Sequence, residues 1–113
     1  MADEKEAAPV NVNGEVSQIT INLRKPIIAN GDEVNVLNFR EPTAGDIERV
    51  GTNPVNLEQI GEHMKFKTTF DTKAMSQMMS ILAAVPPSSI KQMHPKDWNN
   101  AAWELAGFFL PDL

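Results

Sequence analysis

The chain has 113 residues, no cysteine, 42% hydrophobic residues and a formal charge of −5 at pH 7. This length allows one compact domain, because domains usually need about 100–150 residues. Without cysteine the chain forms no disulfide and has no thiolate that could act as a nucleophile or metal ligand.

The negative charge is concentrated at the N-terminus. Residues 1–15 hold four acidic side chains and one basic side chain, a net −3, whereas the remaining residues hold eleven and nine, a net −2. The first segment is polar, and it buries too little to offset about 1–2 kcal/mol of backbone entropy per residue. We therefore predict a disordered acidic tail over residues 1–15 and a single domain over residues 16–113.

The first regular element is a strand over residues 16–23. Its apolar side chains Ile19, Ile21 and Leu23 alternate with polar ones, which is typical of a half-buried strand. Residues 27–29 extend it beyond Pro26, where we expect a sheet edge or a bulge.

A turn and a second strand follow. Residues 30–32, Asn-Gly-Asp, favour a turn because Asn and Gly tolerate positive φ. The apolar pattern over residues 34–39 changes parity between Val36 and Leu37, so a bulge or a strand end is predicted there. Together the two strands predict a β-hairpin, which needs a helix on its apolar face to be stable.

A short helix is predicted over residues 44–50. Thr43 is a good N-cap, and Asp46, three residues on, makes a variant of the capping box. Gly51 suits the C-terminal stop.

Residues 52–70 carry a weaker pattern. Leu57, Ile60 and Met64 have helical spacing, which predicts a middle helix, although Gly61 lies within it. Two aromatic residues are expected to anchor this segment on the domain: Phe66 and Phe70.

The clearest helix begins after Asp71, a suitable cap, and ends before Pro86-Pro87. Its apolar residues form one continuous face. They are Met75, Met78, Met79, Leu82 and Val85.

The last helix is predicted from Pro95 to about Leu110, after a short turn that Ser88-Ser89 can cap. Its inner face is expected to hold Trp98, Ala101, Ala102, Leu105, Phe108 and Phe109. The elements predict an α+β fold, in which an N-terminal β-hairpin packs against a small bundle of three to four α-helices.

The chain offers little for catalysis. Its only histidines are His63 and His94, and a zinc site would need two further ligands at a suitable spacing. The glycines form no phosphate-binding loop. The nearly neutral domain lacks a basic nucleic-acid footprint, and no apolar run is long enough for a membrane span. With no secretory signal either, we expect an intracellular protein with no catalytic residues, metal or cofactor.

With catalysis set aside, binding to a partner protein is the remaining kind of function. Methionine adapts to irregular partner surfaces, so Met75, Met78, Met79 and Leu82 are candidate partner-binding residues, with a place in the core as the alternative. A second candidate is the run of three bulky residues Phe108, Phe109 and Leu110. On a helix, three such neighbours point in most directions, so at least one is expected to be exposed or covered by another chain.

Three stretches stand out by their order and spacing. They are Leu23-x-Lys25-Pro26-Ile27, Phe39-Arg40-Glu41-Pro42-Thr43-x-x-Asp46-Ile47, and the Met-rich helix ending in Pro86-Pro87 before His94-Pro95-x-Asp97. In these stretches the chain resembles the short tail assembly chaperones of Mu-like and P2-like contractile-tailed phages, over about residues 17–110.

The resemblance implies a non-enzymatic assembly factor in the host cell cytoplasm. Such proteins bind the tape measure protein, keep it soluble while tail-tube subunits polymerise around it, and are absent from the mature virion. Related systems also make a frameshifted longer form thought to recruit tail tube protein, and this chain resembles the short form. Exposed residues 108–110 would favour self-association. The alternatives are a structural virion component of the tail or connector and, on net charge alone, a small acidic regulator or DNA mimic.

Overall fold

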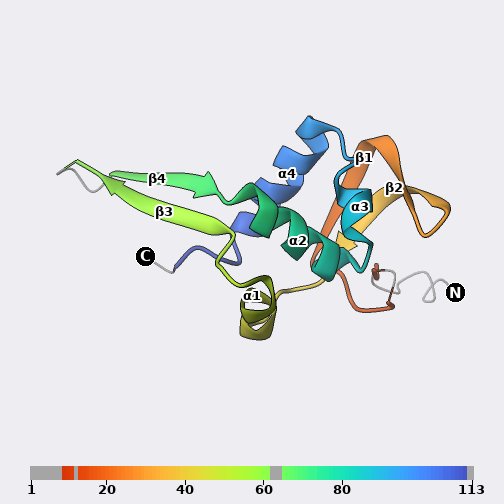
Figure 1. Cartoon of the computed structure of the whole chain (residues 1–113), viewed down its shortest axis with the longest axis horizontal. Coiled ribbons are helices and arrows are strands. Elements are labelled where there is room, and N and C mark those ends of the chain that lie inside the picture. Colours follow the sequence, from red (N-terminus) through yellow and green to blue (C-terminus); the bar gives the residue numbers. More distant parts are fainter. Residues whose placement is uncertain (1–8, 12, 62–64, 112–113) are drawn as a thin grey trace, which may run out of the picture.

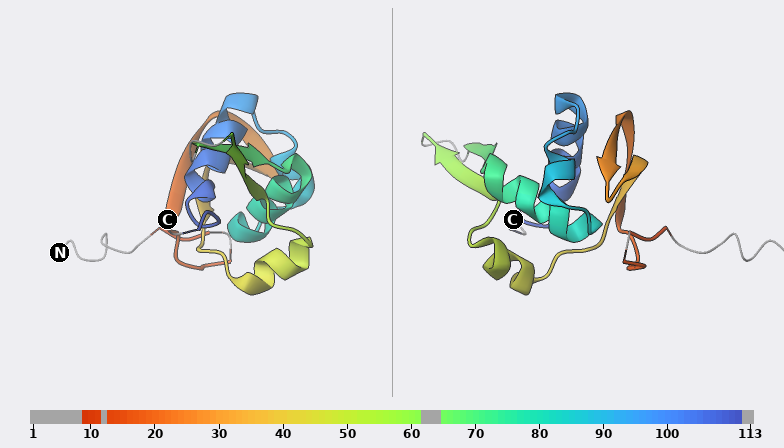
Figure 2. Two further views of the ribbon diagram at one scale, coloured as in Figure 1. Left: turned by 90° about the vertical axis from the view of Figure 1, so that its left-hand side faces the viewer. Right: turned by 45° about the vertical axis from the view of Figure 1, so that its right-hand side comes forward.

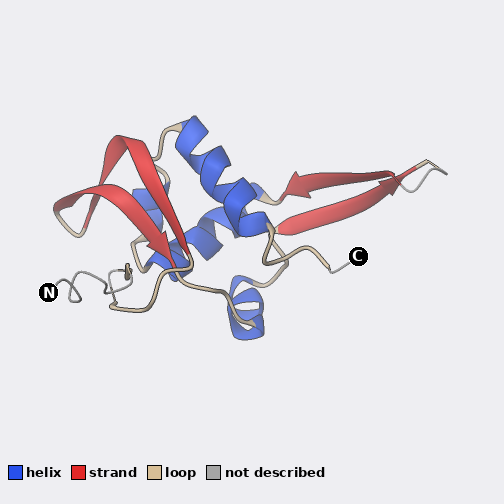
Figure 3. Ribbon diagram, turned by 180° about the vertical axis from the view of Figure 1, so that it is seen from behind, coloured by secondary structure: helices blue, strands red, loops and turns tan. Residues whose placement is uncertain are grey.

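Two β-hairpins lie at opposite ends of the molecule, with the helices between them (Figures 1 and 3). The computed structural model describes residues 9–11, 13–61 and 65–111. Each hairpin is its own two-stranded antiparallel sheet, and the predicted α+β class is confirmed. The elements are β1 (Ile19–Ala29), β2 (Asp32–Phe39), α1 (Ala44–Val50), β3 (Val55–Ile60), β4 (Lys65–Phe70), α2 (Thr72–Ala83), α3 (Pro87–Ile90) and α4 (Pro95–Ala106).

The β1–β2 hairpin turns at Asn30 and Gly31, whose φ angles of 55° and 86° are both positive. The pairing register shifts between Asn22 and Ile27, so the irregularity predicted at Pro26 is confirmed. Of the two alternatives predicted between Val36 and Leu37, the strand end is wrong, because β2 continues to Phe39. The bulge lies one residue earlier in β2, because the register shifts between the pairs Ile27–Val34 and Asn22–Val36.

Asp97 of α4 holds the irregular part of β1 in place. Its carboxylate, only 3% exposed, accepts hydrogen bonds from the backbone N–H groups of Arg24 at 3.0 Å and Lys25 at 3.3 Å. The irregular register leaves backbone donors without a strand partner, and buried donors need an acceptor. The hydroxyl of Ser89 donates to the carbonyl of Ile28 at 2.7 Å, so α3 and α4 both clamp the hairpin.

The core is built around α2. Asp71 caps the helix as predicted, because its side chain accepts from the N–H of Ala74 at 3.1 Å. The helix ends at Ala84, whose φ is 59°. Its apolar face is fully buried against the β1–β2 hairpin, α3 and α4. The largest fully buried side chains include Phe39, Ile27, Leu37, Met75, Met78, Met79, Leu82, Ile90 and Leu105.

The middle helix predicted within residues 52–70 is wrong, because this segment forms the β3–β4 hairpin. Val55 pairs with Phe70 and Ile60 pairs with Lys65, while Gly61 takes a positive φ of 69°. Leu57 and Ile60 share a helical spacing, but in a strand they point to opposite faces. Met64, the third residue of the predicted helix, lies outside the described residues.

Two residues of the predicted tail, Asn11 and Glu15, contact the domain. Asn11 is 6% exposed, and its side-chain amide donates to the carbonyl of Leu82 at 2.9 Å, near the C-terminal end of α2. The carboxylate of Glu15 lies 3.3 Å from the guanidinium of Arg40. The tail was predicted from its low apolar content, and these polar contacts do not depend on apolar burial. Residues 1–8 of the predicted tail lie outside the described residues.

Two helix boundaries differ from the prediction. Pro86, rather than a serine, occupies the N-cap of α3, because the helix begins at Pro87, a residue that suits the first helical position. The last helix ends at Ala106, and residues 107–110 continue as turns instead of completing it to Leu110.

The predicted helix α1 and its capping residues are confirmed. The carboxylate of Asp46, 7% exposed, accepts from both terminal nitrogens of Arg40, at 2.8 and 3.0 Å, and from the N–H of Thr43 at 2.8 Å. Gly51 ends the helix with a φ of 100°. The Arg40 hydrogen bonds, followed by that of the Thr43 backbone, lower the pKa of Asp46 to about 2.

We expect Asp46→Asn to lower the free energy of unfolding by about 1–2 kcal/mol at pH 7. A carboxyl whose pKa is depressed by folding stabilises above its unfolded pKa, near 4, and loses that stabilisation as pH falls through its folded pKa. The difference between the two proteins should therefore shrink between about pH 4 and pH 2 in urea denaturation. Asp32→Asn, at an exposed carboxylate, is the control. An Asp46→Asn difference that does not change with pH would contradict the ion-pair explanation.

Candidate partner-binding surface

The first set of predicted partner-binding residues forms the core. Met75, Met78, Met79 and Leu82 are each 0% exposed. Of the two alternatives in the sequence, a place in the core is therefore the one that the structure shows. A partner cannot reach these side chains unless the domain opens, and adaptable methionines here fill an irregular interior.

The second predicted set is also largely covered. Phe109 is 9% exposed, and Phe108 and Leu110 are half-buried and pack against the core. The helix ends before these residues, so they do not point outward around a continuing helix. Their backbone N–H groups bond back to Leu105 and Ala106, which folds the segment onto the body.

The exposed aromatic side chains lie elsewhere. Trp103 on α4 is 56% exposed and Phe66 on β4 is 43% exposed. Phe70 lies between the core and these residues, with its ring centroid 5.0 Å from that of Trp103 and 6.3 Å from that of Trp98. Both contacts are edge-to-face, a favourable geometry for aromatic pairs.

Trp98 anchors this aromatic group to the body. Its indole N–H donates to the hydroxyl of Ser76 on α2 at 2.9 Å, so its ring is held between α2 and α4. Because Phe70 packs against this fixed Trp98 ring, the base of the β3–β4 hairpin is attached to the helices. The expectation that Phe70 anchors this segment is confirmed, whereas Phe66 does not pack on the domain.

One face of the β3–β4 hairpin extends this group of aromatic side chains away from the helices. Leu57 pairs with Thr68, and Phe66 and Phe70 each lie two residues from Thr68 along β4. Side chains two residues apart in a strand point to the same face, so all four lie on one face of the hairpin. Leu57, Thr68 and Phe70 are half-buried while Phe66 is exposed. We call Leu57, Phe66, Phe70 and Trp103 the aromatic strip.

The shape of the hairpin leaves this strip open. β3 and β4 project away from the helices at one end of the long axis (Figure 1), and the view along that axis shows the hairpin apart from α1 (Figure 2). The part of the strip on β4 spans about 13 Å at about 3.3 Å per residue. A two-stranded hairpin is only marginally stable by itself, and an apolar face that is left uncovered marks an interaction site.

The strip could in part have been recognised in the sequence. Phe66, Thr68 and Phe70 alternate with Lys65, Lys67 and Thr69, a period-2 pattern that competes with the helical spacing around Gly61. Trp103 falls outside the predicted inner face of the last helix. A large aromatic residue on the polar face of an amphipathic helix is a signal for a contact beyond the domain.

The described ranges contain neither a metal-ligand group nor a helix that could cross a membrane. Within residues 9–11, 13–61 and 65–111, no three His, Asp or Glu side chains are grouped to hold a metal ion. Over the same ranges no helix is both long enough and apolar enough to cross a membrane.

Comparison with known protein families finds a match over most of the chain. A family model described as "Phage tail assembly chaperone proteins, E, or 41 or 14" matches residues 20–110. No curated protein matches the chain, and no solved structure matches it.

Proposed function

The chain belongs to the phage tail assembly chaperone family, and on that premise we propose that it binds the tape measure protein, keeps it soluble and assists tail-tube polymerisation around it. The observation that carries this proposal is the family match over residues 20–110. A chaperone of this kind requires exposed apolar surface and no catalytic cleft.

The aromatic strip is the surface that we assign to this function. Its length of about 13 Å on β4 corresponds to between two and three helical turns of about 5.4 Å each, and Trp103 lies beside its inner end, with 5.0 Å between the Phe70 and Trp103 rings. An amphipathic helix would place its apolar residues on Trp103, Phe70 and Phe66. Tryptophan and other aromatic residues supply much of the binding energy in such contacts.

The finer parts of the proposal follow from the same family. The protein acts in the host cell cytoplasm, without catalysis, and is left out of the mature virion. Tail tube protein is recruited through a frameshifted longer form. Self-association, expected in the sequence from Phe108, Phe109 and Leu110, has little support from their burial, and the aromatic strip is the better surface for it.

Co-expression tests the proposal directly. We expect the tape measure protein of the same phage to be mostly insoluble alone and mostly soluble with this chain, and to co-purify with it. Equal insolubility in both cases would disprove the chaperone function. An unrelated acidic protein of similar size is the control for a general solubilising effect.

Composition of purified particles tests the alternative of a structural virion component. Mass spectrometry of mature virions should detect the tape measure protein and not this chain. A stoichiometric amount of this chain in the particles would favour a tail or connector component instead.

A further inference from the structure

A groove runs along the exposed side of α2. A pocket of about 320 Å³ beside Trp98 shares Thr72, Ser76 and Lys91 with a second pocket of about 390 Å³. The second pocket shares Gln77 and Pro87 with a third of about 280 Å³. Because neighbouring pockets share lining residues, they adjoin one another in a row along α2.

The groove continues past the middle of the helix. The third pocket shares Arg49, Ser80 and Ile81 with a fourth of about 320 Å³, which reaches Ala84. The depression, which we call the α2 groove, thus follows α2 from Thr72 to its C-terminal end, about 18 Å at 1.5 Å per residue. α1 lies on one side of α2, and α3 lies on another (Figures 1 and 2).

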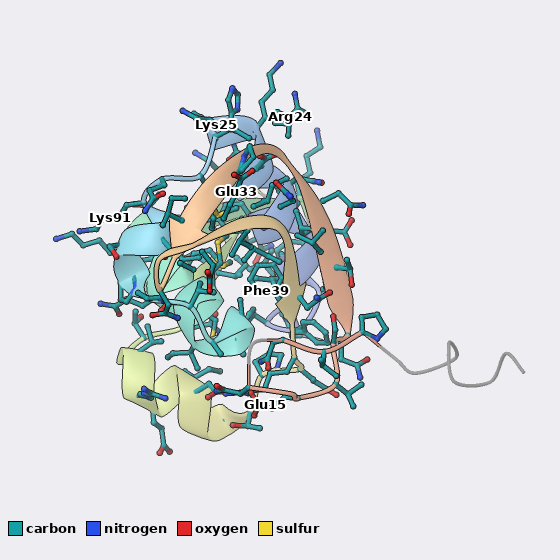
Figure 4. All side chains as sticks on the ribbon, turned by 90° about the vertical axis from the view of Figure 1, so that its right-hand side faces the viewer. Glu15, Arg24, Lys25, Glu33, Phe39 and Lys91 are labelled. Atoms are coloured by element: carbon teal, nitrogen blue, oxygen red, sulfur yellow. The ribbon has the colours of Figure 1, made fainter. Side chains whose placement is uncertain are left out.

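The charged side chains that line the α2 groove are all basic. They are Arg49 on α1, Lys73 on α2 and Lys91 after α3, and no acidic residue lines any of the four pockets. Within the described ranges, none of the three takes part in a recorded ion pair. Lys91 extends away from the body (Figure 4). This local excess of positive charge stands out in a chain of net charge −5.

The walls of the groove also offer apolar contacts. Val50 and Ile81 are half-buried, Trp98 closes one end, and Pro87 is exposed beside them. A second helix can pack on α2 at an axial distance of about 8–10 Å. A partner suited to this groove needs apolar residues on one stripe and carboxylates on its flanks.

We propose that the α2 groove binds an acidic amphipathic helix of another protein. The apolar residues of its walls hold the helix, while Arg49, Lys73 and Lys91 select for carboxylates and steer association. The groove and the aromatic strip are different surfaces, so this interaction goes beyond the proposed function. Nucleic acid fits less well, because three basic residues on a net negative body make a small footprint for a phosphate backbone.

The probe is a fluorescein-labelled helical peptide of about 14 residues, long enough to cover the groove at about 1.5 Å per residue. It carries leucines on one stripe and glutamates on both flanks. Fluorescence anisotropy with the full chain should show saturable binding that weakens at high salt. A scrambled peptide of the same composition, and one with lysines in place of the glutamates, should each bind about tenfold more weakly or worse. Equal binding of the scrambled peptide would overturn the proposal.

Charge reversal locates the binding site. The triple variant Arg49→Glu, Lys73→Glu, Lys91→Glu should raise the Kd for the acidic peptide about tenfold or more. The matched control reverses three exposed lysines outside the groove, Lys25, Lys65 and Lys67, and should change the Kd by about twofold at most. Circular dichroism should show both variants folded. If both variants bound the peptide equally weakly, the effect would come from net charge alone, and the α2 groove would not be the binding site.

Two other occupants are tested with the same assay. Removal of residues 1–8, which hold three acidic side chains and one lysine, should leave the Kd unchanged. About tenfold tighter binding would instead identify the chain's own N-terminus as the occupant and overturn the proposal. Tighter binding of a labelled single-stranded DNA than of the peptide would also overturn it. A Trp103→Asp, Phe66→Asp variant should keep peptide binding, which separates this test from that of the proposed function.

Discussion

Met78→Asp is expected to leave the chain unfolded at neutral pH. The Met78 side chain is 0% exposed on α2, at the centre of the core formed with Met75, Met79 and Leu82. An unpaired carboxylate in such a site has an effective cost of several kcal/mol, and the lost methionine packing adds about 2–5 kcal/mol. Together these match the whole stability of a small domain, about 5–15 kcal/mol.

Far-ultraviolet circular dichroism and thermal denaturation measure this effect. Gln77→Asp is the matched control, because Gln77 is exposed on the same helix and the same residue type is introduced there. Its cost should stay near the difference in helix propensity, about 0.5 kcal/mol. Met78→Leu, which nearly conserves volume, should cost less than about 1.5 kcal/mol. A folded Met78→Asp protein with native thermal stability would mean that Met78 faces a surface.

The double variant Phe66→Asp, Trp103→Asp is expected to lose tape measure protein binding while remaining folded. Both rings are largely exposed, 43% and 56%, so charges at these positions stay in solvent in the free protein. In the complex the same charges would be buried without partners. Loss of two aromatic anchors of about 2 kcal/mol or more each would weaken binding by at least about a hundredfold.

Pull-down from co-expressing cells, together with the soluble fraction of the tape measure protein, measures this loss. Ile28→Asp is the control, because Ile28 is an exposed apolar residue, 49% accessible, on the β1–β2 hairpin at the other end of the molecule. This variant should bind normally. Normal binding by the Phe66 and Trp103 double variant would remove the aromatic strip from the interface, whereas the co-expression result would still decide the chaperone function.

The two surfaces differ in how they are supported. Residues of the α2 groove lie on or beside helices that pack on the buried methionine core. The backbone that carries its basic side chains is therefore held in place by the core. The aromatic strip extends along a hairpin that contacts the rest of the domain at its base, through Phe70 and the buried Val55. An exposed hairpin with few contacts gains stability on binding, and the strip should therefore become more protected from hydrogen exchange when the partner is present.

Local patterns in the sequence determined much of the fold. The apolar spacing from Met75 to Leu82, with Asp71 before it, was enough to predict α2, because helix periodicity and capping depend on residues within a few positions of one another. The Asn30-Gly31 turn between two alternating segments predicted the first hairpin for the same reason. The order of these stretches was also enough to predict the family.

Other properties were decided only by the tertiary structure. A helical face of methionines has the same sequence pattern whether it packs in the core or binds a partner. Met78 is buried because the β1–β2 hairpin, α3 and α4 pack around α2. The pairing of Val55 with Phe70 is a contact between strands, and the helical spacing near Gly61 obscured it. The α2 groove joins Arg49, Lys73 and Lys91 from separate elements. Burial and juxtaposition depend on residues distant in the chain, so one-dimensional periodicity can identify an apolar face without determining what covers it.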